Sequence, residues 1–178
     1  MNGVTRRTSL GAVVSITAGA LVGCTSKGPG STGASLTIGS ASMEPTLMKG
    51  STVAVEPVAA GKYRPRRQDI VFFHPPAAWQ GFDATQLLAS RVIGIPGDTV
   101  SCDGAGSPVW LNHVALKEPY LYPGDTPSTV DFSVKVPTGR LWLLDDHRSI
   151  GLDCRYQVSD ADDGGYVPVG NVVGIYRP

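Results

Sequence analysis

The segment Arg91-Val92-Ile93-Gly94-Ile95-Pro96-Gly97-Asp98-Thr99-Val100 contains the pattern that decides how this chain folds. Its β-branched residues favour a strand that ends at Ile95, Pro96-Gly97 forms a turn, and a second strand starts at Thr99. Short apolar runs between Gly/Pro turns continue on both sides of this segment. The predicted strands are Leu36–Gly39, Thr52–Glu56, Asp69–Phe73, Leu87–Ile95, Thr99–Cys102, Val109–Leu111, Phe132–Val136, Leu141–Leu144 and Asn171–Tyr176.

Length and composition agree with this pattern. The chain has 178 residues, which suits one domain with its own core. It contains 22 Gly and 14 Pro, and helix-period apolar stripes are scarce, so we expect a mainly β, turn-rich domain. Because 15 Lys and Arg balance 15 Asp and Glu, no charge surplus points to a nucleic-acid partner or to an acidic tail.

Residues 1–35 differ in composition from the rest of the chain. Arg6 and Arg7 form a short positive region, and Leu10–Val22 carries no charge. This apolar stretch suits a signal peptide but is short for a membrane span, which needs about 20 apolar residues. We therefore predict a signal peptide over residues 1–23. The two arginines also match part of a twin-arginine export signal, so the export route stays open.

Cys24 directly follows the predicted signal peptide. The tetrapeptide Leu21-Val22-Gly23-Cys24 resembles a bacterial lipobox, in which the cysteine becomes the lipidated N-terminus. Residues 24–35 are small and polar, and would tether a domain over residues 36–178 to the outer face of the cell membrane. The alternative is an ordinary signal peptide, or an uncleaved anchor, with an incidental cysteine.

Five segments, in the same order, resemble the motifs of the type I signal peptidase family. They are Ser40–Leu47, Gln68–Phe72, Arg91–Val100, Leu111-Asn112 with Glu118–Leu121, and Asp145–Arg148 with Asp153–Arg155. The resemblance extends from Leu36 to the C-terminus. It implies a mainly β domain of coiled antiparallel sheets with few short helices and a groove that faces the membrane. It also implies a serine endopeptidase that acts on signal peptides or other exported polypeptides.

The same resemblance implies roles for single residues. Ser42 would be the nucleophile, and Ser40 would help the Ser42 backbone N–H to bind the oxyanion. An extended substrate would bind between two strands, through Leu36, Ile38, Gln86 and Leu88. A charged cluster that braces the site would consist of Asp146, Arg148, Asp153 and Arg155. The plainer alternatives are a serine in a turn, core strands and ordinary surface ion pairs.

Two positions depart from the family pattern. Ser90 stands before Arg91, where bacterial members have the Lys that serves as general base. A serine hydroxyl is far too weak a base to take the proton of the nucleophile. The family's serine that positions this Lys is replaced by Gly151. The expected base and the group that orients it are therefore both absent.

Two further departures lie in the last motif. His147 replaces the family's Asn and is a candidate substitute base, with a polar loop residue as the alternative. Asp145 replaces the family's Gly and predicts a changed backbone at this point.

Cys102 and Cys154 remain after Cys24 is set aside. If the domain is exported, a disulfide between them would close a loop of about fifty residues and stabilise the fold by about 4 kcal/mol. Two buried thiols are the alternative.

Three functions stay open on the sequence. The first is a membrane-surface serine endopeptidase for signal peptides or exported proteins, which retains Ser42 and Ser40. The second is a pseudopeptidase that binds extended peptides or a partner protease, which the loss of the base favours. The third is a lipoprotein that uses the scaffold structurally. No metal-ligand cluster, phosphate-binding loop or nucleotide motif is present, so we predict no cofactor and no metal.

Overall fold

Residues 34–158 and 164–178 are described by the structure, which is a computed structural model. The predicted signal peptide, Cys24 and all but the last two residues of the predicted tether lie outside this part. Those last two residues, Ala34 and Ser35, belong to the first strand, so the tether prediction extended too far. They pair with Val55 and Ala54 of the next strand, and this ladder draws them into the sheet.

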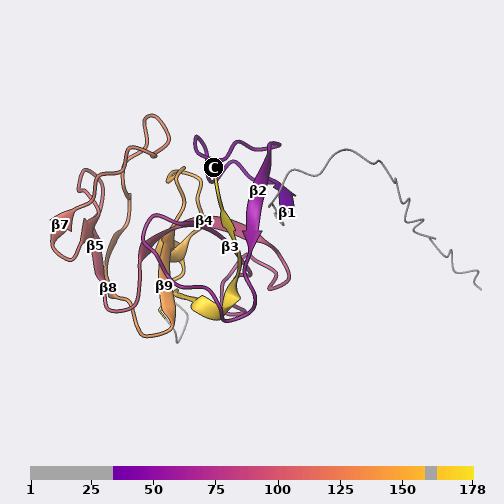
Figure 1. Cartoon of the computed structure of the whole chain (residues 1–178). Coiled ribbons are helices and arrows are strands. Elements are labelled where there is room, and N and C mark those ends of the chain that lie inside the picture. Colours follow the sequence, from indigo (N-terminus) through magenta and orange to yellow (C-terminus); the bar gives the residue numbers. More distant parts are fainter. Residues whose placement is uncertain (1–33, 159–163) are drawn as a thin grey trace, which may run out of the picture. The chain divides into compact units, whose positions relative to one another are not determined.

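A seven-stranded antiparallel sheet is the larger of the two sheets in the described part (Figure 1). Its strands, in spatial order, are β1 (Ala34–Thr37), β2 (Thr52–Pro57), β11 (Val172–Tyr176), β3 (Ile70–Phe73), β4 (Leu88–Gly94), β9 (Arg140–Leu144) and β10 (Val167–Pro168). All neighbouring strands in it run antiparallel.

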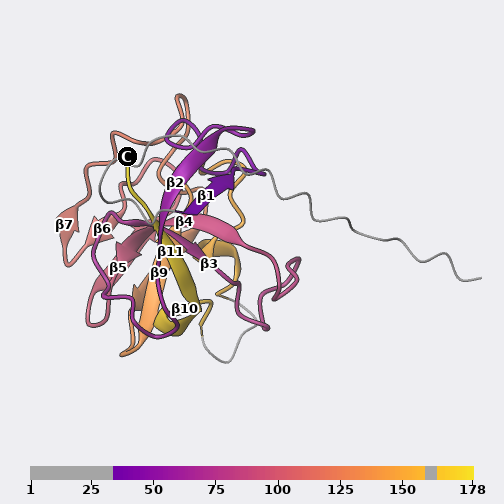
Figure 2. The same ribbon diagram turned by 45° about the vertical axis from the view of Figure 1, so that its right-hand side comes forward.

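A smaller antiparallel sheet follows the Pro96-Gly97 turn. Its strands, in spatial order, are β7 (Val114–Ala115), β6 (Trp110–Leu111), β5 (Thr99–Asp103) and β8 (Asp131–Lys135). Figures 1 and 2 both show β5 and β7 on the side away from β1 and β2. Two short 3-10 turns, η1 (Cys154–Tyr156) and η2 (Val169–Asn171), are the helical elements of the described residues.

The prediction of a mainly β, antiparallel fold is confirmed, and each predicted strand is present with its ends moved by one or two residues. The sequence missed β7 and β10. Each has two residues, which is too short for an alternating apolar pattern to be visible.

Gly94 lies where β4 leads into the second sheet. A Cβ at this position would lie 2.8 Å from a methyl group of Val100 and 2.8 Å from one of Val136. The close packing of the two sheets at this corner therefore requires glycine.

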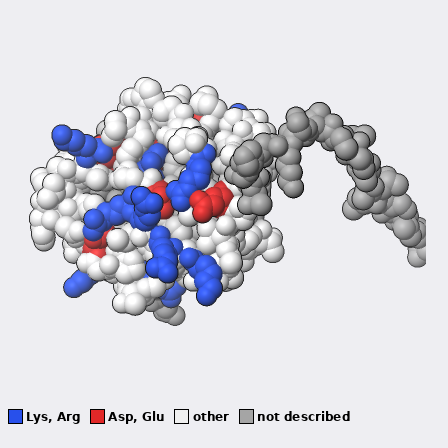
Figure 3. Space-filling view, in the orientation of Figure 1, with Lys and Arg blue, Asp and Glu red and all other residues white. Residues whose placement is uncertain are grey.

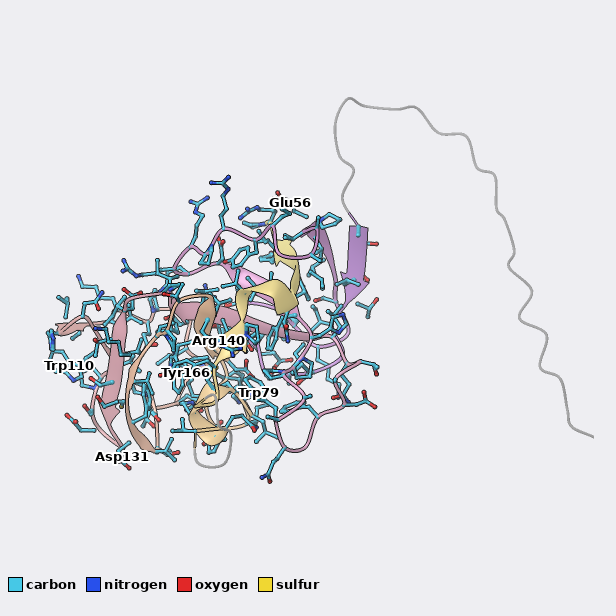
Figure 4. The ribbon with its side chains drawn as sticks, turned by 90° about the horizontal axis from the view of Figure 1, so that it is seen from below. Glu56, Trp79, Trp110, Asp131, Arg140 and Tyr166 are labelled. Carbon is cyan, nitrogen blue, oxygen red and sulfur yellow. The ribbon has the colours of Figure 1, made fainter. Side chains whose placement is uncertain are left out.

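The core has two parts. The larger part surrounds Trp142, which is fully buried together with neighbouring residues of β3, β4 and β9. The smaller part lies under the β1–β2 connection, and it consists of Ile38, Met43, Leu47, Val55, Ile70 and Phe72. Figure 4 shows Trp79 and Tyr166 near the middle of the described part, whereas Trp110 and Asp131 lie at its edge on the smaller sheet.

Charges on the surface are mixed. Figure 3 shows Lys and Arg side chains gathered on one face, with Asp and Glu side chains among them. Arg177 and Glu56 form an exposed ion pair, in which Arg177 Nε donates to Glu56 Oε2 over 2.8 Å. Arg67 also forms two hydrogen bonds to the buried carboxylate of Asp98. Burial opposes ionisation of Asp98, but the hydrogen bonds from Arg67, the Ile95 N–H and Asn112 together outweigh it and hold its pKa below the ordinary value.

Candidate active site

A groove of about 480 Å³ runs between β1 and the start of β4. These strands are not neighbours in the sheet, so the sheet must coil to bring them to opposite walls. The predicted nucleophile, oxyanion donor, base position and substrate residues all line this groove. They are Ser42, Ser40, Ser90, Leu36, Ile38, Gln86 and Leu88.

Ser42 lies in the connection between β1 and β2, and this connection is anchored on both sides. Met43 and Leu47 are 1% exposed and pack into the smaller core, which fixes the turn from below. The backbone N–H of His147 donates to the Ser42 carbonyl over 2.9 Å. Ser42 itself is half-buried, and its position is therefore set by tertiary contacts on either side of the turn.

Ser40 lies beside the backbone of Ser42. The Ser42 N–H donates a hydrogen bond to Ser40 Oγ over 3.1 Å. Ser40 Oγ accepts this bond, and its own O–H stays available as a donor at the edge of the groove. A hydroxyl donor in this place can stabilise a developing oxyanion.

Ser90 faces the groove from β4 and is 4% exposed. Its hydroxyl donates a hydrogen bond to Oδ1 of Asp145, the residue that directly follows β9. Strand β4 pairs with β9, and Arg91 lies opposite Leu144. This pairing brings the side chains of Ser90 and Asp145 together. Ser42 lines the same groove, and its side chain is close enough to lower the pKa of this carboxyl group. Asp145 therefore connects the predicted nucleophile to the position of the missing base.

Asp145 is an unusual carboxyl group. Burial raises its pKa to about 8, and the negative charge of Asp153 acts in the same direction. The hydrogen bond from Ser90, the positive charge of Arg155 and the side chain of Ser42 lower the pKa only in part. Its backbone N–H donates to Asp153 Oδ2 over 2.9 Å. The site thus holds a carboxyl group that gains and loses its proton near neutral pH.

Gly151 provides the space for this carboxyl group. A Cβ at position 151 would lie 2.6 Å from Cβ and 2.9 Å from Oδ2 of Asp145. Real Cβ atoms do not approach other atoms so closely, so a serine at 151 and this Asp145 conformation exclude each other. Asp145 and Gly151, which both depart from the family pattern, are therefore in steric contact and depend on each other.

The backbone of His147 contacts that of Ser42, but its imidazole ring points elsewhere. Nδ1 lies 3.2 Å from the Ala41 carbonyl, and the ring stacks on Tyr122 with 3.7 Å between centroids. His147 is not among the residues that line the groove. Its ring is therefore engaged in holding the Ser42 turn against the last motif.

The charged cluster forms three buried ion pairs, with partners that the sequence did not assign. Asp146 accepts hydrogen bonds from Arg91 Nε over 2.7 Å and from Arg91 Nη2 over 2.6 Å. Asp146 also accepts a hydrogen bond from Thr46, which links the cluster to the Ser42 turn. Arg91 lies over the ring of Tyr120, with 4.0 Å to the centroid.

The other two pairs hold the segment after β9. Arg148 pairs with Glu118, and its Nε donates to the Asp145 carbonyl over 2.7 Å. Arg155 pairs with Asp153 over 2.8 Å. These side chains are almost completely buried, unlike the exposed partners of a surface ion pair. They fix the backbone of Asp145 from both sides.

The walls of the groove differ in structure. Leu36 belongs to β1, an edge strand that pairs only with β2 among the described strands. Gln86 precedes β4 instead of belonging to it. Its carbonyl oxygen lies 2.8 Å from Nδ1 of His74, and its side-chain oxygen accepts a hydrogen bond from the Asp83 N–H.

The predicted disulfide is not formed. Cys102 and Cys154 are both free and buried. Cys102 Sγ contacts the carbonyls of Gly104 and Ser107, whereas Cys154 Sγ accepts from the Leu143 N–H over 3.2 Å. Burial raises the pKa of the Cys154 thiol well above its usual value. The alternative of two buried thiols is the one that the structure contains.

Sequence reasoning missed Asp145 as a groove residue, and Arg91 and Glu118 as partners in the charged cluster. The signal for Asp145 was present, because it replaces a glycine and is followed by a second carboxylate. Its contact with Ser42 depends on the pairing of β4 with β9, which a sequence does not display. Within residues 34–158 and 164–178, no group of His, Cys, Asp and Glu is arranged to hold a metal, and no helix is long and apolar enough to span a bilayer.

Known proteins resemble this chain over most of its length. The family model described as signal peptidase, peptidase S26, matches residues 16–177. A probable signal peptidase I-1 of Synechocystis is 32% identical over 77% of this chain, and a signal peptidase I of Leptolyngbya laminosa is 34% identical over 77%. The chain spans 65% and 63% of the length of these two relatives.

A solved structure is also similar. It is a signal peptidase I from Enterococcus faecalis, 30% identical, matched over 64% of this chain and 97% of that one with a TM-score of 0.47. The family model covers most of the chain, including both walls of the groove and the turn that carries Ser42. The chain therefore belongs to the signal peptidase family, peptidase S26.

Proposed function

We propose that this protein is a serine endopeptidase that cleaves signal peptides or other exported polypeptides at the outer face of the membrane. Ser42 is the nucleophile, and the observation that carries the proposal is its position in the groove. There it lies next to the Ser40 hydroxyl and beside the buried carboxyl group of Asp145, which lines the same groove.

The edge strand β1 supports a substrate in extended form. An edge strand offers unpaired backbone N–H and C=O groups, to which a peptide adds as a further strand. Leu36 of β1 and Leu88 of β4 face this path from opposite walls. The backbone provides affinity, and the apolar lining selects small or apolar side chains.

The rim of the groove supports a site close to a membrane. Leu87, Ile150 and Leu152 line the groove and are 42%, 50% and 55% exposed. Apolar side chains of this size rarely gather at an exposed rim without a partner. A lipid on Cys24, followed by the tether, would hold the rim at the membrane surface.

The test is cleavage of a signal-peptide-bearing preprotein by the full chain in detergent micelles. Ser42→Ala should abolish cleavage, because it removes the hydroxyl that attacks the substrate carbonyl carbon. Ser40→Ala should lower kcat about 10²–10³-fold with little change in KM, since it removes an oxyanion donor. Ser133→Ala, at an exposed position of β8, is the matched control and should leave the rate unchanged.

A second function is peptide binding without cleavage. The observation that favours it is that neither Lys nor His is among the described residues that line the groove. Wild-type protein that binds a signal peptide but does not cleave it would support this function and contradict the first. Loss of both binding and cleavage would favour a structural role for the scaffold.

A further inference from the structure

We propose that the Asp145 carboxylate is the general base that activates Ser42. This inference rests on the proposed peptidase function, and it goes beyond that function by assigning the group that replaces the missing lysine.

The contacts of Asp145 carry the assignment. Its carboxyl group lines the groove together with Ser42 and accepts a hydrogen bond from Ser90 at Oδ1. A candidate base must come close to the proton that it removes, and Asp145 is the acidic residue that lines the groove beside Ser42, whose side chain lowers its pKa. The ring of His147 is engaged with Ala41 and Tyr122.

The surroundings of Asp145 give it suitable basicity. The groups that face it are Ser90 from β4, Ser42 from the β1–β2 connection, and Asp153, Cys154 and Arg155 from the segment at η1. Burial and Asp153 raise its pKa to about 8, which outweighs the opposing effects of Ser90, Arg155 and Ser42. A general base works best when its pKa lies near the working pH, and an ordinary aspartate is too acidic for this task.

Four residues around Asp145 provide this arrangement together. Ser90 is short, so it leaves room at the base position and donates to Asp145 instead of competing with it. Gly151 has no side chain where the Asp145 carboxyl group lies. Arg148 and Asp153 bond the backbone carbonyl and N–H of Asp145 and so hold it in place. Ser90 is thus a positioning residue for the carboxyl group.

Asp145 accepts and returns one proton in each half of the reaction, so the site ends in its starting protonation state. As Ser42 Oγ attacks the substrate carbonyl carbon, its proton moves to the Asp145 carboxylate, and the carbonyl oxygen becomes an oxyanion beside Ser40. When the C–N bond breaks, Asp145 gives this proton to the leaving amine. A water molecule then attacks the acyl-enzyme ester and passes its proton to Asp145. On collapse the C–O bond to Ser42 breaks, and Asp145 returns the proton to Ser42 Oγ.

The experiment measures kcat, KM and their pH dependence for preprotein cleavage by the full chain. Asp145→Asn has almost the same shape and should lower kcat about 10²–10⁴-fold with KM nearly unchanged. Asp103→Asn, at an exposed position of β5, is the control for loss of a carboxylate and should keep wild-type kcat. In the wild type, kcat/KM should rise with pH through an inflection near 8, where Asp145 loses its proton.

Ser90→Ala separates positioning from a structural effect. The hydrogen bond from Ser90 lowers the pKa of Asp145, so its removal should move the inflection of the pH profile to higher pH. A merely structural loss would lower the rate at all pH values without moving the inflection.

A triple variant, Ser90→Lys/Asp145→Gly/Gly151→Ser, restores the family pattern and removes the carboxyl group that would otherwise pair with the new lysine. If the wild type cleaves and Asp145→Asn keeps its cleavage rate within a factor of two, the assignment of the base is overturned, but the peptidase function stays intact. A silent wild type with an active triple variant would overturn the assignment and favour a peptide-binding protein. If neither protein cleaves, the proposed function itself fails.

Discussion

The Cβ that any other residue would place at position 151 lies 2.6 Å from Cβ of Asp145. This relationship joins two substitutions that lie six positions apart in the sequence. Because the space beside Asp145 is filled by its own carboxyl group, Gly151 is required as long as Asp145 keeps this conformation.

Gly151→Ser is therefore expected to be destabilising. Overpacking of a buried site typically lowers the free energy of unfolding by about 1–3 kcal/mol. The carboxyl group of Asp145 should also be displaced, which would reduce cleavage. Urea titration of the single variant, of Asp145→Gly and of the double variant forms a double-mutant cycle.

The double variant should recover most of the stability lost by Gly151→Ser, because the clash disappears with the Asp145 side chain. Gly170→Ala is the matched control, since a Cβ at this position meets no atom within 4 Å. Strictly additive effects of the two substitutions would contradict the steric coupling.

The pH dependence of stability should carry the signature of Asp145. Its pKa is raised to about 8 in the folded protein, against about 3.9 in an unfolded chain. Between these values the folded state binds more protons than the unfolded state, so the contribution of Asp145 to stability falls as the pH rises from about 4 to about 8. Above pH 8 both states are ionised, and this contribution stays constant.

Asp145→Asn removes the loss of stability that ionisation of Asp145 causes as the pH rises. The difference in melting temperature between this variant and the wild type should be larger at pH 9 than at pH 5, by at least about 2–4 °C. This is the shift that 1 kcal/mol produces in a domain of this size. The variant would then gain stability at alkaline pH and lose activity. A difference in melting temperature that does not change with pH would show that Asp145 has an ordinary pKa.

The pair of Asp146 with Arg91 should be far more important for stability than the exposed ion pairs. Asp146→Asn leaves the buried guanidinium of Arg91 without its counter-charge, and removal of one partner from such a pair costs about 3–5 kcal/mol. Glu56→Gln is the matched control, because its pair with Arg177 is exposed and should contribute at most about 1 kcal/mol. Chemical denaturation of both variants provides the comparison, and equal losses would contradict this assignment.

Cys102 and Cys154 should both react as thiols once the protein is unfolded without reductant. Alkylation before and after unfolding, followed by peptide mass mapping, distinguishes the two states. In the native protein the Cys154 thiol should be inert, because it is fully buried and its pKa is raised. A peptide pair joined through these two cysteines would contradict the free thiols.

Much of the fold followed from local sequence patterns. The Arg91–Val100 segment folds as predicted, with β4, a turn and β5, because β-branched runs and a Pro-Gly turn act over a few residues. Strands β7 and β10 were missed, since two-residue strands exist only through their partners. The predicted strand at Leu36 was misplaced by two residues, because the register with β2 decides where β1 begins.

The order of motifs also predicted which residues lie at the groove. Ser40, Ser42 and Ser90 were predicted at the groove, and they line it. The pairing within the charged cluster was not predictable, because Asp146 meets Arg91 and Arg148 meets Glu118 across long sequence separations.

The sequence by itself established the β-rich class, the family resemblance and the absence of the expected lysine, since each of these depends on residue identity and order. Only the tertiary structure decided what occupies the place of the base. The coiling of the large sheet and the pairing of β4 with β9 bring Asp145 to Ser42 and Ser90. Burial there changes the acidity of this carboxyl group, and burial is a property of the folded chain.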